Sequence, residues 1–313
     1  MLIGIDGGGT KTALVLAEEN GRLLNTVKGL GSNPADIGLE ECENRLRSEL
    51  DELLRGFGGR EATVDSVYAG IAGSANERTK AAVGEILRRL LPNARRVDNG
   101  SDAFNALYGE AEEGIALIAG TGSSAFVLTK DGSHQVGGWG YLVDDAGSGF
   151  RVGADALKAA YRSYDGRGEK TKLEELCARR LELPLGEAIP RIYEGGKRYI
   201  ATFSFAVLEA AHAGDAIAEG ILSDAANALA DHLRACLRFV SARPAVAVVS
   251  GGLIENDEIL ERVRAALGAQ KNDVQLVRPH VAPVYGALVK AARNAGVPIT
   301  ETFRESFKAT PRK

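Results

Sequence analysis

This 313-residue chain has few cysteines, few aromatic residues and only a small net charge. Its three cysteines, Cys42, Cys177 and Cys236, are odd in number, far apart and outside any metal-ligand spacing, so we expect free thiols and no disulfide. The four histidines are scattered without ligand spacing either. A formal net charge of −4 without a basic run disfavours a nucleic-acid partner.

Long hydrophobic runs are also missing. No apolar stretch approaches the length of a membrane span, and the opening MLIGIDGGG has neither a basic start nor a long apolar segment. We therefore expect no membrane partner, no signal peptide and a cytoplasmic location, where thiols stay reduced. Two common nucleotide motifs are absent: Lys11 follows Thr10, which is not the Walker A order, and no GxGxxG opens a helix.

What the chain does have is an alternation of strands and helices, at a length that suits two domains. The opening predicts three strands, joined by a glycine-rich turn at Gly7–Gly9 and a hairpin turn at Asn20-Gly21. Further on, the patterns predict a helix over 40–54, a strand over 66–72, a helix over 77–91, a strand over 94–97 and a helix that opens near Ser101 or Asp102. This alternation indicates the α/β class.

The chain also repeats itself. GGTKTALVL from Gly8 returns as GTGSSAFVL from Gly120, each after an apolar strand and before a hairpin turn. The segment from Ser66 resembles the segment from Ala245, and each precedes a last helix. The duplication predicts two similar domains, residues 1–108 plus 283–303 and residues 109–282. We expect a helical insert over roughly 140–243 and a last helix, 283–295, that crosses back onto the first domain.

Glycine corners at strand ends are suited to binding anions, because their backbone N–H groups can point at one ligand. Taken alone, the Gly7–Gly9 motif fits a tight structural turn, but the repeat of this motif at Gly120 favours phosphate binding. Two corners that face each other would suit a polyphosphate. VVSGGLIEN from Val248 adds a third corner at a strand end, where α/β proteins bind ligands.

Four motifs together resemble the sugar kinase, actin and heat-shock chaperone superfamily. They are DGGGTKT from Asp6, GTGS from Gly120, GGWGYLVDDAGSG from Gly137 and SGGLIEN from Ser250. Their order and spacing are similar to the BadF/BadG/BcrA/BcrD ATPase-like family, in particular its N-acetylglucosamine kinase branch, from Leu2 to about Gly296. The resemblance implies two ribonuclease-H-like (actin-like ATPase) domains with a cleft between them, and a homodimer through the second domain.

The resemblance also implies ATP and Mg²⁺ as cofactors and a small sugar as substrate. Asp6 would contact Mg²⁺, and Asp102 would be the catalytic base that takes the proton of a sugar hydroxyl. The implied nucleotide-binding residues are Gly8, Gly9, Thr10, Lys11, Thr12, Gly120, Thr121, Gly122, Ser123, Gly251 and Gly252. The implied sugar-binding residues are Asn33, Asp102, Gly138, Trp139 and Asp145.

Some of these residues also fit plain structural roles. Asp102 fits a helix N-cap, although Ser101 can serve as that cap. Asp144 competes with Asp145 for the sugar, and the Gly147-Ser148 that follows favours Asp145. Trp139 fits core packing, but its glycine neighbours favour a cleft lining. The polar tail FRESFKATPRK predicts a frayed end.

The resemblance predicts an ATP-dependent kinase that converts N-acetylglucosamine to its 6-phosphate. Glucosamine, glucose and N-acetylmuramic acid stay open as substrates. Two other classes are a dehydratase-activating ATPase and a non-catalytic sugar sensor. The first holds an iron–sulfur cluster through paired cysteines, a pattern that this chain lacks. The presence of Asp6, Asp102 and both corners argues against the second.

Overall fold

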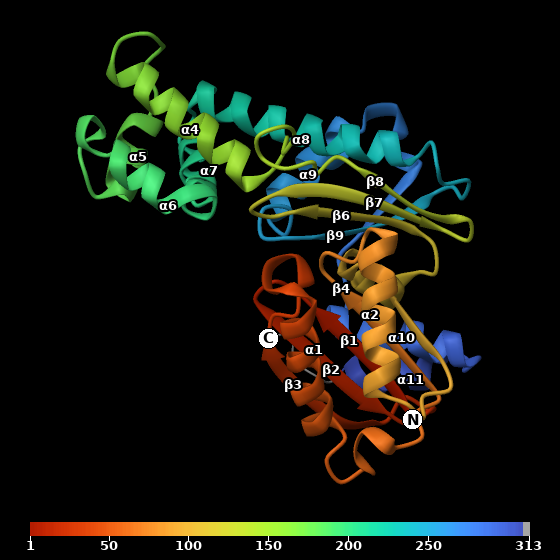
Figure 1. Ribbon diagram of the computed structural model, residues 1–313. Coiled ribbons are helices and arrows are strands. Elements are labelled where there is room, and N and C mark those ends of the chain that lie inside the picture. The colour runs from red at the N-terminus through yellow and green to blue at the C-terminus, as the bar shows by residue number, and fades with distance from the viewer. Residues whose placement is uncertain (309–313) are drawn as a thin grey trace. The chain divides into compact units, whose positions relative to one another are not determined.

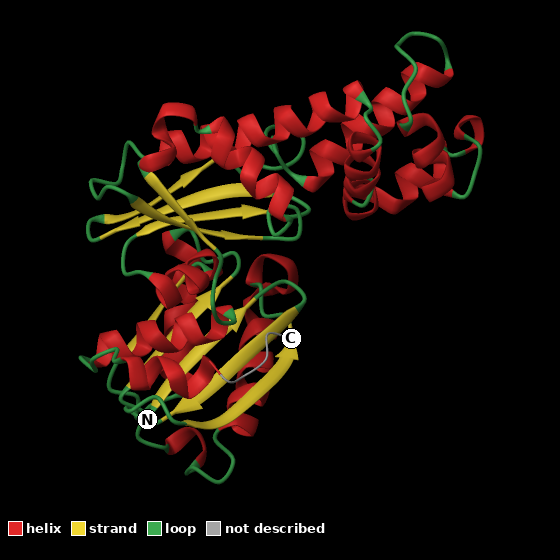
Figure 2. Ribbon diagram, turned by 180° about the vertical axis from the view of Figure 1, so that it is seen from behind, coloured by secondary structure: helices red, strands yellow, loops and turns green. Residues whose placement is uncertain are grey.

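The computed structural model describes residues 1–308, and the chain divides into two compact units (Figure 1). Unit 1 joins Met1–Glu113 to the chain from Pro279 onward, and unit 2 is Gly114–Arg278. Each unit contains one five-stranded sheet with helices against it (Figure 2). The fold is therefore of the mixed α/β class.

The sheet of unit 1 has the strand order β3-β2-β1-β4-β5. The first three strands pair antiparallel, and β4 and β5 continue the sheet parallel to β1. The strands are β1 (Leu2–Gly7), β2 (Lys11–Ala17), β3 (Leu23–Leu30), β4 (Ser66–Ile71) and β5 (Val97–Gly100). The helices are α1 (Pro34–Leu53), α2 (Glu77–Leu90), α3 (Asn105–Glu110), α10 (Pro283–Ala295) and α11 (Glu301–Lys308), with short 3₁₀ turns η1 (Gly59–Glu61) and η2 (Asp102–Phe104).

Helices cover both faces of this sheet, which explains why β1 is an apolar run rather than an alternating one. Ile3 and Ile5 pack in the cluster that contains Leu46 and Leu50 of α1, and Leu2 packs in the cluster that contains Leu288 of α10. Figure 1 shows α1 and α2 on one side of the sheet and α10 with α11 on the other. The predicted return of the last helix to the first domain is thus observed.

The sheet of unit 2 repeats the same plan, with the order β10-β9-β6-β7-β8. The strands are β6 (Gly114–Ala119), β7 (Ser123–Thr129), β8 (Gly132–Val136), β9 (Ala245–Ser250) and β10 (Val274–Val277). The helices are α4 (Gly149–Tyr164), α5 (Leu173–Leu181), α6 (Ile189–Ala201), α7 (Ser204–His212), α8 (Ala216–Cys236) and α9 (Asp257–Ala266), with η3 (Leu185–Glu187) and η4 (Gly268–Asn272). Helices α4 to α8 separate β8 from β9 and form the predicted insert. Two ribonuclease-H-like units are therefore confirmed.

Three local predictions were wrong. The strand predicted over 94–97 is β5, Val97–Gly100, because Ala94 makes only an isolated bridge to Val64 and the polar strand VDNG carries no apolar signal. Helix α1 begins at Pro34 instead of residue 40, since Gly38 (φ 80°, ψ 162°) interrupts its first turns. The tail predicted as frayed forms α11 up to Lys308, because Phe303 and Phe307 are one helical turn apart and both buried. Residues 309–313 of that tail lie outside the described residues.

The three cysteines are free and fully buried. Burial raises the pKa of Cys42 to about 11 and the pKa of Cys177 and Cys236 to about 12, so all three stay as inert thiols. Across residues 1–308, no helix combines the length and the apolar content that crossing a membrane requires.

Unit 1 also buries the side chain of Glu49, to which the sequence analysis assigns no functional role. Glu49 of α1 lies against Gly29 of β3, and its Oε2 atom has no hydrogen-bond partner. Burial raises its pKa from 4.5 to about 7, an effect that Arg45 partly opposes. Because the folded state holds this proton more tightly than the unfolded state, the stability contributed below pH 4.5 is lost as the pH rises to about 7.

Glu49→Gln is therefore expected to raise the melting temperature by a few degrees at pH 8 and to change it little at pH 4.5. The comparison is thermal unfolding of both proteins across this pH range. The exposed Glu40→Gln on the same helix is the control, and its curve should run parallel to that of the parent chain. If the curve of Glu49→Gln also runs parallel to that of the parent chain, the raised pKa of Glu49 in the folded state is contradicted.

Candidate active site

Two carboxylates share the carboxyl edge of the unit 1 sheet. Asp6 lies near the end of β1, and Asp102 follows β5, which runs parallel to β1 on the far side of β4. Burial raises the pKa of Asp6, although Asn105 and Lys11 oppose the shift. The pKa of Asp102 is raised to about 6, first by burial and second by the negative charge of Asp6. The two groups therefore interact within one site.

Asp102 is not needed as a helix cap. Ser101 caps η2, because its Oγ atom accepts a hydrogen bond from the Ala103 amide at 3.3 Å. Its hydroxyl also lies 3.4 Å from Asp102 Oδ1. The plain N-cap interpretation of Asp102 is thus wrong, and its carboxylate is left for another role.

Asn105 belongs to this site and was missed by the sequence analysis. Its side chain is fully buried, and Nδ2 donates to Asp6 Oδ1 at 2.6 Å and to the Gly70 carbonyl at 3.2 Å. A side chain on Gly70 would overlap the Asn105 amide, so the glycine in β4 permits this arrangement. Asn105 lies three residues after Asp102, on the same helical face, and the lone asparagine in the run DAFNALY is the signal that could have identified it.

The turn between β1 and β2 exposes only part of the predicted phosphate corner. Gly8 N donates to the Lys11 carbonyl at 2.9 Å, which closes the turn. Thr12 is fully buried, and its hydroxyl donates to the Leu30 carbonyl at 2.7 Å and lies within hydrogen-bond distance of Ser32 Oγ at 2.9 Å. Gly9, Thr10 and Lys11 are the exposed residues of the corner. Thr12 therefore supports the turn from inside.

Asn33, a predicted sugar ligand, caps α1. Its Oδ1 atom accepts from the Ala35 amide at 3.0 Å, and its Nδ2 atom donates to Asp36 Oδ2 at 2.7 Å. Both halves of the amide thus have partners in the first turn of α1. The cap fixes the side chain at the start of α1.

In unit 2, the corner between β6 and β7 is held from the loop that precedes α4. Asp145 Oδ1 accepts from the Ser123 amide at 2.7 Å, and the Ser123 hydroxyl donates to the Ala146 carbonyl at 2.8 Å. Phe150 N donates to the Thr121 carbonyl at 3.1 Å. Ser123 is buried with its donors in use, so Thr121 and Gly122 are left as the open part of this corner.

A cavity of about 480 Å³ adjoins the same corner. Of the predicted nucleotide residues it contains Gly120, Thr121 and Gly252. Its other walls come from the insert and from the turn after β9, and they include Arg198, Thr202, Phe205, Leu208 and Asn256, which the sequence analysis missed. The guanidinium of Arg180 lies 5.5 Å from the centre of the half-exposed Phe205 ring. The volume lies within the range of small-ligand sites.

The glycine pair after β9 has two distinct roles. Gly251 has φ 107°, and a Cβ atom there would lie 2.6 Å from the Ala119 carbonyl. That carbonyl accepts hydrogen bonds from Leu253 N and Ile254 N, both at 3.1 Å. A Cβ atom on Gly252 would meet no atom within 4 Å, because this residue borders the cavity. Gly251 therefore makes the turn, while Gly252 leaves space beside it.

The loop predicted to bind the sugar has an exposed apolar rim and a buried acidic residue. Trp139 is 62% exposed, so the core-packing interpretation is wrong. Gly138 (φ 74°) lies against Ser124, where a side chain would overlap. Asp145 is buried, and its Oδ2 atom forms an ion pair with Lys197 Nζ at 2.7 Å. Lys197 is a further residue that the sequence analysis missed.

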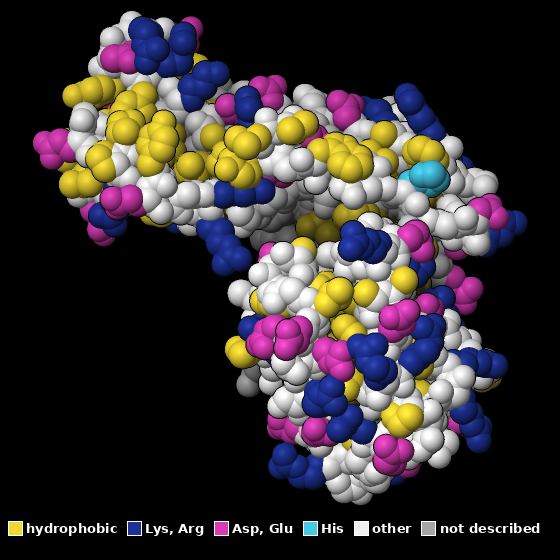
Figure 3. All heavy atoms as spheres, in the orientation of Figure 1, with side chains coloured by type: hydrophobic (Ala, Val, Ile, Leu, Met, Phe, Trp, Pro, Cys, Tyr) yellow, Lys and Arg dark blue, Asp and Glu magenta, His cyan; other side chains and the backbone are white. Residues whose placement is uncertain are grey.

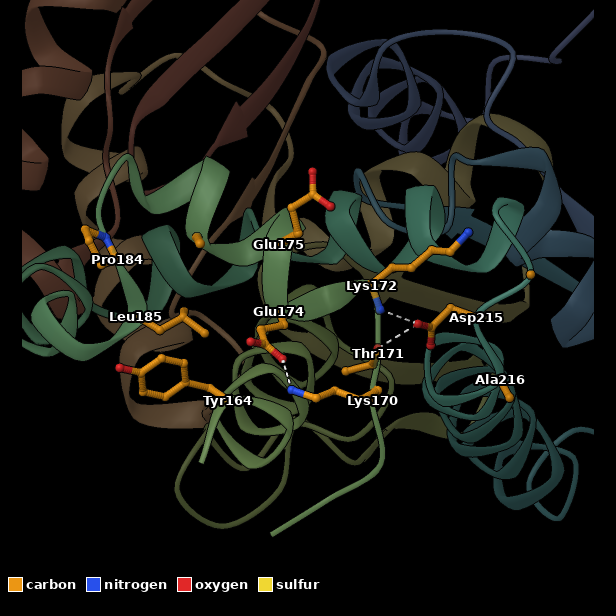
Figure 4. Close-up of a pocket in the computed structure, with 12 residues that line it drawn as sticks. Tyr164, Lys170, Thr171, Lys172, Glu174, Glu175, Pro184, Leu185, Asp215 and Ala216 are labelled. Atoms are coloured by element: carbon orange, nitrogen blue, oxygen red, sulfur yellow. Dashed lines mark hydrogen bonds and ion pairs between the residues drawn. The ribbon is translucent and has the colours of Figure 1, made fainter. Parts of the chain in front are cut away.

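A larger cavity, of about 730 Å³, lies within the insert and contains none of the predicted residues. Figure 4 shows Asp215 at its wall, where the carboxylate accepts from Thr171 Oγ1 at 2.7 Å and from Lys172 N at 2.6 Å. Lys170 contacts Glu174 Oε2 at 3.3 Å. These polar groups are paired with one another. Among residues 1–308 there is also no group of three or more His, Cys, Asp or Glu side chains that could hold a metal ion by itself.

Comparisons with known proteins agree with this architecture. The chain matches the BadF/BadG/BcrA/BcrD ATPase family over residues 3–291. It is 32% identical over 299 residues to the N-acetylmuramic acid/N-acetylglucosamine kinase of Clostridium acetobutylicum, covering 93% of this chain and 97% of the relative. It is 30% identical over 280 residues to the N-acetyl-D-glucosamine kinase of Dictyostelium discoideum, covering 83% and 87%.

Solved structures show the same fold. A Chromobacterium violaceum protein with the provisional name N-acetylglucosamine kinase superposes with a TM-score of 0.67 at 25% identity, over 92% of this chain and 97% of that one. A ROK family glucokinase from Streptomyces griseus, solved with glucose and AMPPNP, gives a TM-score of 0.56 at 18% identity, over 94% and 99%. Because the Streptomyces griseus protein is only 18% identical, its similarity to this chain indicates the fold alone.

Proposed function

The chain belongs to the BadF/BadG/BcrA/BcrD ATPase family, and from that premise we propose that it is an ATP-dependent sugar kinase that converts N-acetylglucosamine to its 6-phosphate. The observation that carries the proposal is the pair Asp6 and Asp102 at one sheet edge, with the pKa of Asp102 raised to about 6. The names of two relatives that are 30% and 32% identical support the choice of sugar.

Asp102 is the proposed catalytic base. A sugar hydroxyl is a poor nucleophile until a carboxylate accepts its proton during attack. A base is most effective when its pKa lies close to the working pH, and burial beside Asp6 moves Asp102 in that direction. Asn33, Gly138, Trp139 and Asp145 are kept as proposed sugar-binding residues.

Asp6 is the proposed metal residue. Mg²⁺ is usually held by one or two carboxylates together with substrate phosphates and water, so a single oriented carboxylate fits. Asn105 occupies Asp6 Oδ1 and fixes the orientation of the group. Burial raises the pKa of Asp6, so a cation beside it would stabilise the charged form. When bound, Mg²⁺ would neutralise charge on the β- and γ-phosphates.

We assign the adenosine part of ATP to the 480 Å³ cavity of unit 2. The exposed Thr121 and the half-buried Gly122 support phosphate binding beside this cavity, and the exposed Gly9, Thr10 and Lys11 of unit 1 are kept as proposed phosphate-binding residues. Gly8, Gly120 and Gly251 shape the turns of these corners, and Gly252 leaves space at the cavity. Thr12 and Ser123 act from inside these corners.

The two glycines after β9 give a matched test of this assignment. Gly252→Val is expected to fold normally and to raise the KM for ATP about tenfold, because the side chain enters the cavity. Gly251→Ala is expected to destabilise the chain by about 2 kcal/mol, because it strains the backbone and meets the Ala119 carbonyl. Thermal unfolding and ATP titrations of both variants distinguish the roles. A normal KM for ATP in Gly252→Val would place adenosine elsewhere.

N-acetylmuramic acid is the second candidate substrate, because the Clostridium acetobutylicum relative is named for both sugars. The dehydratase-activator alternative has less support, because all three cysteines are buried and none offers a surface ligand to a cluster. The deciding experiment is ADP release from Mg·ATP with N-acetylglucosamine, N-acetylmuramic acid, glucosamine, glucose, N-acetylmannosamine or no sugar. Strong turnover with the first sugar supports the proposal, and equal release without sugar would overturn it.

A cytoplasmic homodimer stays part of the proposal. Free, buried cysteines support a reducing compartment. Apolar side chains gather on the helical insert in the face shown in Figure 3, and Ile189 and Tyr193 of α6 are 46% and 81% exposed. A second copy of the chain could bury such a surface. Light scattering of the purified protein tests this, and a monomeric mass at micromolar concentration would contradict it.

A further inference from the structure

The helical insert supplies one lysine to the phosphate corner of unit 2. Lys197 Nζ lies 2.7 Å from Asp145 Oδ2, and Asp145 Oδ1 accepts from the Ser123 amide at 2.7 Å. A Cβ atom on Gly122 would lie 3.2 Å from the same ammonium group. Ammonium, carboxylate and amide thus form a continuous chain from the insert to the corner.

The local backbone of α6 places this lysine. Gly196, with φ 60° and ψ −163°, interrupts the helix directly before Lys197, a conformation that glycine adopts without strain. Farther along, the Ile200 carbonyl approaches Gly153 of α4 so closely that a side chain on that glycine would overlap it. Helix α6 is therefore held tightly against α4, whose first residues contact the corner.

Two aromatic rings complete the surroundings of the ammonium group. Lys197 Nζ lies 5.4 Å from the centre of the Tyr141 ring and 5.9 Å from the centre of the Phe150 ring. Tyr141 belongs to the proposed sugar-side loop, and Phe150 belongs to the first turn of α4. Cation–π contacts at these distances are favourable. One side chain thus contacts the loop, the corner and the helix that joins them.

The ion pair is largely removed from water, with 5% of the Asp145 side chain and 31% of the Lys197 side chain exposed. A buried carboxylate that loses its cation carries an uncompensated charge and rearranges. Movement of Asp145 would break its hydrogen bond to the Ser123 amide, which directly follows Thr121 and Gly122 in the chain. Displacements of about 1 Å in such positioning groups cost up to about 100-fold in rate.

We propose that Lys197 is a positioning residue that acts through Asp145, coupling the sugar-side loop to the nucleotide corner so that the insert sets the geometry of both. The inference rests on the proposed kinase function. It assigns a role in the reaction to a residue far in sequence from all four motifs.

The test is a double-mutant cycle of Lys197→Met and Asp145→Asn, with Lys197→Arg and the exposed Lys158→Met of α4 as controls. Lys197→Met is expected to lower kcat/KM for both ATP and sugar about 10- to 100-fold. Lys197→Arg keeps the charge and should recover part of this loss, and Lys158→Met should match the parent chain. In the Asp145→Asn background, Lys197→Met should lower kcat/KM by less than about a further threefold, because both changes break the same ion pair.

Lys197→Met within twofold of the parent chain, or losses that multiply in the double variant, would overturn the proposal. Should Lys197→Met prove too unstable, the double variant replaces it, since it leaves no unpaired buried charge. Its kcat/KM should then lie within about threefold of that of Asp145→Asn, and a larger further loss would contradict the proposed role. A parent chain that phosphorylates no sugar would refute the kinase function instead. Calorimetric ADP binding, weakened in Lys197→Met and normal in Lys158→Met, would still decide the role of Lys197.

Discussion

Asp102→Asn is expected to lower kcat about 10³-fold while the affinities for ATP and sugar stay within a few fold. General-base catalysis by a positioned carboxylate contributes about 10²- to 10⁴-fold, and the amide keeps the size and polarity of the group without accepting a proton. Stopped assays with the variant at saturating substrates measure kcat, and calorimetry measures binding. Asp131→Asn, in the hairpin between β7 and β8, is the matched control and should keep full activity. A kcat within tenfold of the parent value would remove Asp102 from the base role.

The same assignment fixes the pH dependence of the reaction. Because the pKa of Asp102 is raised to about 6, the base is protonated below that pH and free above it. The kcat/KM for the sugar should therefore fall about tenfold per pH unit below 6 and level off above 7. The stability effect of Glu49 follows a different curve, so thermal unfolding at each pH separates loss of catalysis from loss of fold.

Gly286→Ala has the largest expected effect on the fold. Gly286 in α10 faces α3, and a Cβ atom there would overlap the backbone carbonyl of Asn105 and lie 3.0 Å from Gly109 N. The two helices must separate to make room, at a cost of about 3 kcal/mol, which lowers the melting temperature by roughly 10 °C. Since Asn105 also orients Asp6, activity at low temperature should fall as well.

Gly220→Ala is the matched control for this change. Gly220 lies on the exposed side of α8, where a Cβ atom would meet nothing within 4 Å. In such a position alanine is about 1 kcal/mol more favourable than glycine, so this variant should melt slightly higher. The same glycine-to-alanine change is thus expected to lower the melting temperature at position 286 and to raise it at position 220. A Gly286→Ala protein that melts with the parent chain would contradict the observed contact between α10 and α3.

The strands and helices of both units were largely predictable, because burial on both faces of a sheet leaves long apolar runs such as Leu2–Ile5. The internal repeat then indicated two units of one plan, and the shared strand order bears this out. Two short elements were predicted wrongly. β5 is the polar strand VDNG, and α11 depends on Phe303 and Phe307 contacting residues far away in sequence.

The residues of the site were harder to predict from the sequence, because tertiary contacts decide which side chains reach it. Glycine corners are local motifs, so their positions could be predicted, but which of their hydroxyls face inward depends on tertiary contacts. Thr12 and Ser123 turn their hydroxyls into the protein. Lys197 and Phe205 come from helices α6 and α7, which carry none of the four motifs, and only the packing of these helices brings them to the site. Asn105 could have been predicted, because it lies about one helical turn after Asp102.

The central claim is that phosphate passes from ATP to a sugar hydroxyl activated by Asp102. The most direct measurement is a ³¹P NMR time course of Mg·ATP and N-acetylglucosamine with the parent chain and with Asp102→Asn. The account predicts that a sugar 6-phosphate resonance grows in step with ADP in the parent chain, with little inorganic phosphate, and is nearly absent in the variant. Inorganic phosphate as the main product, or equal sugar phosphate from both proteins, would contradict it.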